Sequence, residues 1–186
     1  MLIQIRGTSG SGKTTLARAV MAAYPAQGNF YRPGRKQPLY TLHTGKGGRD
    51  LAVIGHYNCA CGGADTIADG FVYILDLVRE LHNKGFDVLW ESMLMTGDTK
   101  NVIPLCQEIP EHMIVALTTP VQQCLDNVQT RRAAKGNHKP LNPSNTTSKH
   151  RSEFLSHVKL REAGVNLLVA DYPTALEHIK RALEID

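Results

Sequence analysis

The stretch GTSGSGKT at residues 7–14 matches the Walker A pattern at every position. A short apolar run, residues 2–6, precedes it, and a helical pattern from Lys13 to about Tyr24 follows it. Glycines in such a loop let successive backbone N–H groups turn inward around a phosphate, toward which the helix presents its positive end. A glycine-rich turn can also join a strand to a helix without binding anything, but a full match in this position is rare by chance. The pattern therefore predicts a phosphate site.

The residue types of this loop suit ATP with Mg²⁺. Lys13 is expected to reach the β and γ phosphate oxygens, and the hydroxyl of Thr14 to ligate Mg²⁺. The residues expected to bind the nucleotide are Gly7, Thr8, Ser9, Gly10, Ser11, Gly12, Lys13, Thr14 and Thr15. These roles predict an ATP-dependent phosphotransferase.

A carboxylate is needed beside such a loop, at the end of a neighbouring strand, to hold the metal or its water. Glu91 follows the apolar run 86–90 and has this position in the sequence. The alternative is a surface or helix-capping glutamate. We predict that Thr14 and Glu91 form the metal site.

Transfer to a hydroxyl also needs a base that takes up its proton. Asp65 follows the pair Gly62-Gly63, whose backbone is expected to approach a ligand closely, and precedes a helical pattern. The alternative is that Asp65 or Thr66 caps that helix. The sequence favours Asp65 as the base but leaves open which carboxylate takes the role.

Two arginines, Arg131 and Arg132, end a predicted helix just before a polar stretch, residues 135–147. Guanidinium groups stabilise the charge on a phosphoryl group during transfer, which suits a lid that closes over the γ-phosphate. The alternative is a solvated helix end favoured by the helix dipole. We predict a lid at about residues 131–150.

Strand and helix patterns alternate along the chain, which indicates an α/β fold with a doubly wound parallel sheet and a short lid, in one domain spanning residues 1–186. The possible strand 39–43 is expected to form a hairpin with 51–57. The other predicted strands are 2–6, 86–90, 113–118 and 165–170. The predicted helices are 13–24, 67 to about 84, 121–134, 148–163 and 174–183.

The bulk composition is that of a globular protein, with 186 residues, 42% hydrophobic and 20% charged. No apolar run is long enough to span a bilayer, so we expect no membrane partner and a cytoplasmic location. The four cysteines are then expected to be reduced thiols. A zinc site at His56, Cys59 and Cys61 is disfavoured, because no second ligand pair follows.

Charge is strongly segregated along the chain. Residues 1–64 carry eight Lys or Arg against one Asp, and residues 131–161 carry eight against one Glu. Residues 65–130 between them carry three basic and ten acidic residues. Two basic segments are either solvated faces or the two sides of a site for a polyanion larger than ATP.

The order of elements resembles that of the thymidylate-kinase-like group of small P-loop kinases. The stretch from Gly55-His56-Tyr57 to Cys61-Gly62-Gly63-Ala64-Asp65-Thr66-Ile67 resembles, more narrowly, the phage 5-hydroxymethyldeoxyuridine DNA kinases. This resemblance implies phosphorylation of the 5-hydroxymethyl group of 5-hydroxymethyluracil within DNA, on the way to hypermodified thymidines, in the cytoplasm of a phage-infected host. Glu91-Ser92 stands where the wider group has an Asp-Arg pair, which argues against a free-nucleotide substrate.

Two other functions stay open from the sequence. One is a nucleoside, nucleotide or other small-molecule kinase, whose activity would depend little on salt, whereas DNA binding weakens steeply as salt rises. The other is an ATPase or nucleotide-dependent switch with no dedicated acceptor. Neither the oligomeric state, nor the choice between single and double strands, nor base flipping is determined by the sequence.

Overall fold

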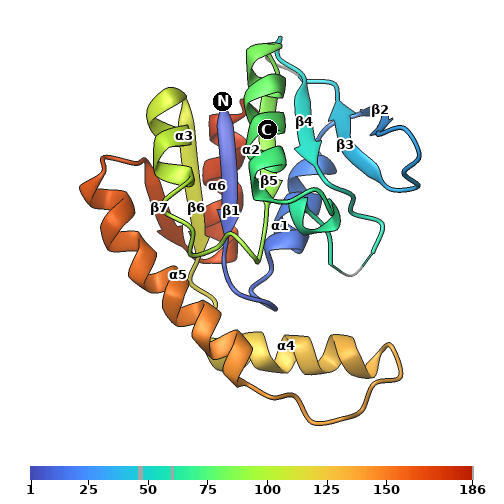
Figure 1. The fold of residues 1–186 in the computed structure, drawn as a ribbon, viewed down its shortest axis with the longest axis vertical. Coiled ribbons are helices and arrows are strands. Elements are labelled where there is room, and N and C mark those ends of the chain that lie inside the picture. Colours follow the sequence, from blue (N-terminus) through green and yellow to red (C-terminus); the bar gives the residue numbers. More distant parts are fainter. Residues whose placement is uncertain (46–47, 60, 186) are drawn as a thin grey trace.

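The computed structural model describes residues 1–45, 48–59 and 61–185. A seven-stranded sheet with the order β2-β3-β4-β5-β1-β6-β7 forms its centre (Figure 1). The strands are β1 (Leu2–Arg6), β2 (Ala26–Tyr31), β3 (Pro38–His43), β4 (Leu51–Ile54), β5 (Asp87–Glu91), β6 (His112–Leu117) and β7 (Leu167–Ala170). The helices are α1 (Lys13–Met21), the 3₁₀ turn η1 (Ala64–Thr66), α2 (Phe71–Asn83), α3 (Val102–Glu108), α4 (Val121–Ala133), α5 (Ser144–Glu162) and α6 (Tyr172–Ala182).

Apolar side chains cover both faces of the sheet, because successive residues of a strand point to opposite sides. Leu2 of β1 packs into the cluster beneath α2 and α3, and its neighbour Ile3 packs into the cluster beneath α1 and α6. A strand buried on both faces reads as a continuous apolar run, as residues 88–90 and 113–117 do. The doubly wound α/β prediction is therefore confirmed.

The sheet departs from a purely parallel one at a single edge. Strands β4, β5, β1, β6 and β7 are mutually parallel, whereas β3 pairs antiparallel with both β4 and β2. The predicted hairpin of β3 with β4 is confirmed. Strand β2 was not expected, because its residues are largely exposed and lack the apolar pattern of a buried strand.

Three helices also differ from the prediction. Helix α3 was not predicted, α2 begins at Phe71 rather than at residue 67, and α5 begins at Ser144 rather than Ser148. The loop expected at 135–147 therefore ends at residue 143. Residues 144–147 are Ser-Asn-Thr-Thr, which favour turns in isolation. A tertiary contact holds them, because Thr146 is buried and its carbonyl accepts a hydrogen bond from Thr8 Oγ1 (3.0 Å).

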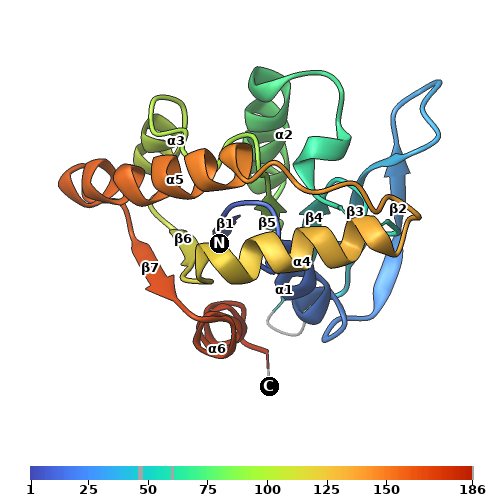
Figure 2. The same ribbon diagram turned by 90° about the horizontal axis from the view of Figure 1, so that it is seen from below.

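Helices α4 and α5 lie across the carboxyl edge of the parallel strands, below the loop that joins β1 to α1 (Figure 1). Seen from below, they run side by side on either side of that loop (Figure 2). None of the described helices is long and apolar enough to cross a membrane. This edge, where strand ends and helix ends meet, is where ligands bind in open α/β sheets.

Candidate active site

A cleft of about 460 Å³ opens at the carboxyl edge of β1 and β5. Ten of the residues singled out from the sequence line it, namely Ser9, Gly10, Gly12, Lys13, Thr14, Thr15, Gly62, Asp65, Glu91 and Arg131. Sequence analysis missed four further lining residues, Arg18, Cys61, Met93 and Asn127. The periodicity of α1 would have indicated Arg18, because it lies one turn after Thr14 on the same helix face.

The glycines of the loop are required by its shape. Gly10 has φ +81°, and a Cβ there would lie 2.2 Å from the carbonyl oxygen of Cys124, so no other residue fits. Asn127 of α4 fastens the same point, because its side-chain amide donates to Gly10 O (2.8 Å). Within the described residues, the buried hydroxyl of Ser11 has no hydrogen-bond partner, so the loop has a polar group still to be satisfied.

Three residues predicted to bind the nucleotide, Gly7, Thr8 and Ser11, do not line the cleft. The N–H of Gly7 donates to Thr96 Oγ1 (2.8 Å), and the N–H of Ser11 donates to Thr8 O (3.2 Å). Their polar groups therefore brace the loop in this conformation. Ser9, Gly10 and Gly12 present the accessible part of the loop.

Lys13 is the buried cation of the site. Its ammonium donates to the carbonyl oxygens of Gly7 (2.7 Å) and Thr8 (3.0 Å). Burial lowers the pKa of Lys13, and the nearby carboxylate of Glu91 acts in the opposite direction. Among the described residues, the hydrogen-bond partners of this buried ammonium are neutral carbonyls, so it is suited to bind an anion.

Thr14 and Glu91 come together as the sequence predicted, because the hydroxyl of Thr14 donates to Glu91 Oε1 (2.6 Å). Burial raises the pKa of Glu91, while Lys13 and the hydrogen bond from Thr14 lower it. A hydroxyl and a carboxylate are the hard oxygen donors that Mg²⁺ prefers in phosphoryl-transfer sites. The pair therefore fits a magnesium ion. Within the described residues, no group of three or more His, Cys, Asp or Glu side chains is placed to bind a metal by itself.

Asp65 faces the same cleft from η1. Its carboxylate accepts hydrogen bonds from Ser92 Oγ (2.5 Å) and from the N–H of Met93 (2.6 Å), which lie just after β5. Helix α2 begins only at Phe71, after Gly70, so the alternative that Asp65 caps this helix is wrong. Asp65 instead ties η1 to the end of β5.

Gly63 explains why glycines precede Asp65. It has φ +85°, and a Cβ there would lie 2.6 Å from the carbonyl oxygen of Glu91 and 2.8 Å from its side chain. The expected close approach to a ligand was thus wrong for Gly63, which packs against a neighbouring strand of the protein, whereas Gly62 lines the cleft. The packing of Gly63 brings the carboxylates of Asp65 and Glu91 into one cleft.

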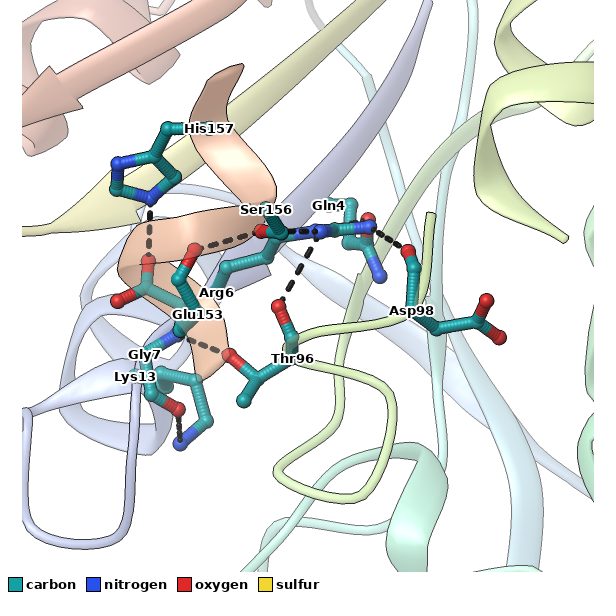
Figure 3. A network of polar contacts seen from close by, with 9 residues as sticks. All are labelled: Gln4, Arg6, Gly7, Lys13, Thr96, Asp98, Glu153, Ser156 and His157. Atoms are coloured by element: carbon teal, nitrogen blue, oxygen red, sulfur yellow. Dashed lines mark hydrogen bonds and ion pairs between the residues drawn. The ribbon is translucent and has the colours of Figure 1, made fainter. Parts of the chain in front are cut away.

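Beneath the loop, Arg6 is the centre of a buried polar network (Figure 3). Its guanidinium donates to the carbonyl oxygens of Thr96 (3.2 Å) and Asp98 (2.7 Å), to Gln4 Oε1 (2.9 Å) and to Ser156 Oγ (3.4 Å). Burial lowers the pKa of Arg6 to about 10. The network joins β1, the segment after β5 and α5, so the start of the loop is fixed from three sides.

Helix α5 also carries a buried histidine–carboxylate pair in this region, in which His157 Nε2 lies 2.9 Å from Glu153 Oε1. Helix α4 brings Arg131 into the cleft, whereas Arg132, next to it in the helix, does not line it. Arg18 donates to the carbonyl oxygens of Tyr57 (2.6 Å) and Cys59 and so holds the segment that leads to η1. All four cysteines are free thiols.

Known proteins match the chain over most of its length. A protein named 5-hmdU DNA kinase from Pseudomonas phage PaMx11 is 40% identical over 184 residues, which cover 98% of this chain and 97% of that protein. The chain belongs to the 5-hmdU DNA kinase family. A member from Pseudomonas phage M6 is 30% identical and covers 98% of this chain and 97% of its own, and one from Delftia phage PhiW-14 is 24% identical and covers 88% and 65%. No protein-family profile matches the chain.

Solved structures of another kinase share the fold. Two structures of deoxyadenosine kinase from M. mycoides, one with bound dATP and one with products, have TM-scores of 0.50 and 0.51 and identities of 14% and 12%. They cover 99% of this chain and 100% and 99% of their own. These structures confirm the predicted fold. The 5-hmdU DNA kinases confirm the assignment as a phosphotransferase and the family that the sequence resembles.

Proposed function

We propose that this protein transfers the γ-phosphoryl group of ATP to the 5-hydroxymethyl group of 5-hydroxymethyluracil within DNA. The observation that carries the proposal is one cleft in which the loop lysine, the Thr14–Glu91 pair and Asp65 converge. The names of the relatives supply the acceptor. The phosphate ester formed is then a substrate for further steps that lead to hypermodified thymidines.

The donor half of the cleft holds the triphosphate. Ser9, Gly10 and Gly12 direct the loop around the phosphates, and Lys13 neutralises the β and γ oxygens once it leaves the carbonyls of Gly7 and Thr8. Thr14 and Glu91 hold a magnesium ion, which when bound neutralises charge on the phosphates. Lys13 is buried, so its charge acts on the transferred group with little screening by water.

The acceptor half of the cleft activates the hydroxyl. Asp65 accepts the proton of the 5-hydroxymethyl group as its oxygen bonds to the γ-phosphorus. The bond from that phosphorus to the β–γ bridging oxygen breaks, which leaves ADP and a phosphate monoester on the DNA. Ser92 and the N–H of Met93 fix the orientation of the Asp65 carboxylate during this transfer.

The lid over the two halves of the cleft comprises the end of α4 and the segment up to the first turns of α5, approximately residues 131–150. Arg131 already lines the cleft and stabilises the charge on the phosphoryl oxygens. Arg132 lies outside the cleft lining, so we propose for it a contact with the DNA backbone or with solvent. The 5-position of a pyrimidine lies in the major groove, so a DNA acceptor reaches the cleft by that edge or by flipping.

The test offers γ-labelled ATP to DNA that contains 5-hydroxymethyluracil, to the same DNA with thymine, and to free nucleosides and nucleotides. The proposal expects label on the modified DNA alone, and only when Mg²⁺ is present. More label on a free nucleoside or nucleotide than on the modified DNA would identify a small-molecule kinase. Release of phosphate without a labelled acceptor would identify an ATPase.

A further inference from the structure

A second cavity lies beside the active-site cleft and plays no part in the transfer described above. It measures about 400 Å³, within the range of ~300–1,000 Å³ that small-ligand sites occupy. One wall is the β2–β3 hairpin loop and the other is the segment between η1 and α2, and the two lie side by side in Figure 2. The hairpin is an addition to the parallel sheet, so this cavity is separate from the fold's phosphate loop.

Strand register places the cavity on the same edge as the cleft. Tyr40 of β3 pairs with Ile54, the last residue of β4, so the start of β3 lies at the carboxyl edge of the parallel strands. The two sites meet at η1. Asp65 lines the active-site cleft, and its neighbour Thr66 lines the second cavity. Neighbouring residues of η1 therefore line both sites.

The lining of the cavity combines apolar and cationic groups. Its apolar lining residues, called the floor below, are Pro38, Leu39, Ile67 and the exposed Ala68. Its cationic lining residues, called the rim below, are Arg32, Arg35 and Lys36, and they face one carboxylate, that of Asp69. An apolar floor with a cationic rim matches one nucleotide of a strand, whose base has a flat ring face and whose phosphate is anionic.

The carboxylate of Asp69 arranges the rim. It forms a close ion pair with Arg32 (2.5 Å), which also lies over the ring of Tyr73 at 4.7 Å from its centroid. Arg35 lies farther from Asp69 (3.6 Å) and is 55% exposed, and Lys36 is exposed as well. The Arg32 guanidinium is thus held by Asp69, whereas Arg35, whose ion pair with Asp69 is longer and more exposed, and Lys36 can reach a ligand in the cavity.

We propose that this cavity binds the nucleotide next to the phosphorylated one in the DNA strand, a proposal that rests on the DNA substrate of the previous section. The sugar and base of that neighbour lie on the apolar floor, and its phosphate contacts Arg35 and Lys36. The cavity gives the enzyme affinity for a strand over a single nucleoside.

Direct binding tests the proposal. Fluorescence anisotropy measures the affinity of the wild type and of the double variant Arg35→Ala/Lys36→Ala for single-stranded oligonucleotides with a central 5-hydroxymethyluracil. We expect the double variant to bind a 12-residue oligonucleotide about tenfold more weakly, and the dependence of log affinity on log salt to become shallower by about 0.7 for each phosphate that the protein no longer neutralises. A nucleoside and a trinucleotide are then used as competitors of the oligonucleotide. The wild type is expected to bind the trinucleotide more tightly than the nucleoside, and the double variant is expected to lack this gain in affinity.

The control is Lys84→Ala/Arg181→Ala, which removes two exposed cations outside both cavities, on α2's end and on α6. It matches the loss of net charge and is expected to retain wild-type affinity and salt dependence. An equal loss in both double variants would show that only net charge matters and would overturn the proposal, as would unchanged binding in Arg35→Ala/Lys36→Ala. The binding results do not depend on phosphate transfer. A protein that binds the strand through this cavity but labels only free nucleosides would therefore refute the proposed function, and of this inference only strand binding by the cavity would remain.

Discussion

The two sides of the active-site cleft are stabilised by different means. On the nucleotide side, Arg6 and Lys13 are buried, and each is held by hydrogen bonds to carbonyl groups deep in the sheet edge. On the acceptor side, Asp65 is exposed, and the hairpin beyond it is held by the partly exposed ion pair of Arg32 with Asp69. The donor chemistry is thus part of the core, whereas acceptor recognition lies on a surface that can change without disturbing the core.

The greatest loss is expected from Lys13→Ala on the nucleotide side. Removal of this buried cation is expected to lower the rate of transfer by about 10³-fold or more, since a single preorganised charge in a dry site contributes that much. The melting temperature is expected to stay the same or rise, because burial disfavours the ammonium in the free protein. Initial rates with labelled ATP and thermal melts measure the two effects. Near-normal transfer would remove the proposed donor site.

Asp65→Asn tests the acceptor side. We expect transfer to fall by roughly 10²-fold or more, because an amide cannot accept the proton. Ser92→Ala is the matched control, since it removes a hydrogen bond to Asp65 and leaves the carboxylate in place. Single-turnover rates of the two variants separate the roles: equal, small losses would show that Asp65 only ties η1 to the end of β5.

Arg6→Met tests whether the buried Arg6 network stabilises the phosphate loop on the nucleotide side. The substitution keeps an apolar stem but leaves the carbonyls of Thr96 and Asp98 without their donor, so we expect the free energy of unfolding to fall by about 2 kcal/mol. Urea denaturation measures it, with Arg181→Met on the surface of α6 as the control. The affinity for ATP is expected to fall as well, because Gly7 is braced by Thr96. A variant as stable as the wild type would mean that the network does not hold the loop.

The mildest change concerns the lid. Arg131→Ala is expected to lower kcat about tenfold, less than a fully buried donor would, because Arg131 is partly exposed. Arg132→Ala removes the same charge one residue along the helix, outside the cleft, and serves as the matched control. Its kcat is expected to stay within about twofold of the wild type. Identical losses in kcat would indicate a general effect of charge at the end of α4.

Much of this site could be predicted because its residues follow local rules. A strand, a glycine loop and a helix fix Lys13 and Thr14 in relation to one another within one short segment. The apolar run before Glu91 identifies a central strand, whose end falls at the same edge. Arg6 and its partners could not be predicted, because they are contributed by β1, by the segment after β5 and by α5. Strand β2 and the second cavity were missed for a related reason, since an exposed edge strand has no apolar period.

The α/β class, the phosphate loop and the set of charged residues available for chemistry follow from the amino-acid sequence alone, because they depend on backbone freedom and hydrophobic period over a few residues. Only the tertiary structure shows which of those side chains contact one another. In the folded chain, Glu91 pairs with Thr14, and Asp65 accepts a hydrogen bond from Ser92 instead of capping α2. Arg131 lines the cleft, whereas Arg132 does not. Such pairings join segments far apart in the chain, and only close packing of the whole sheet edge selects among them.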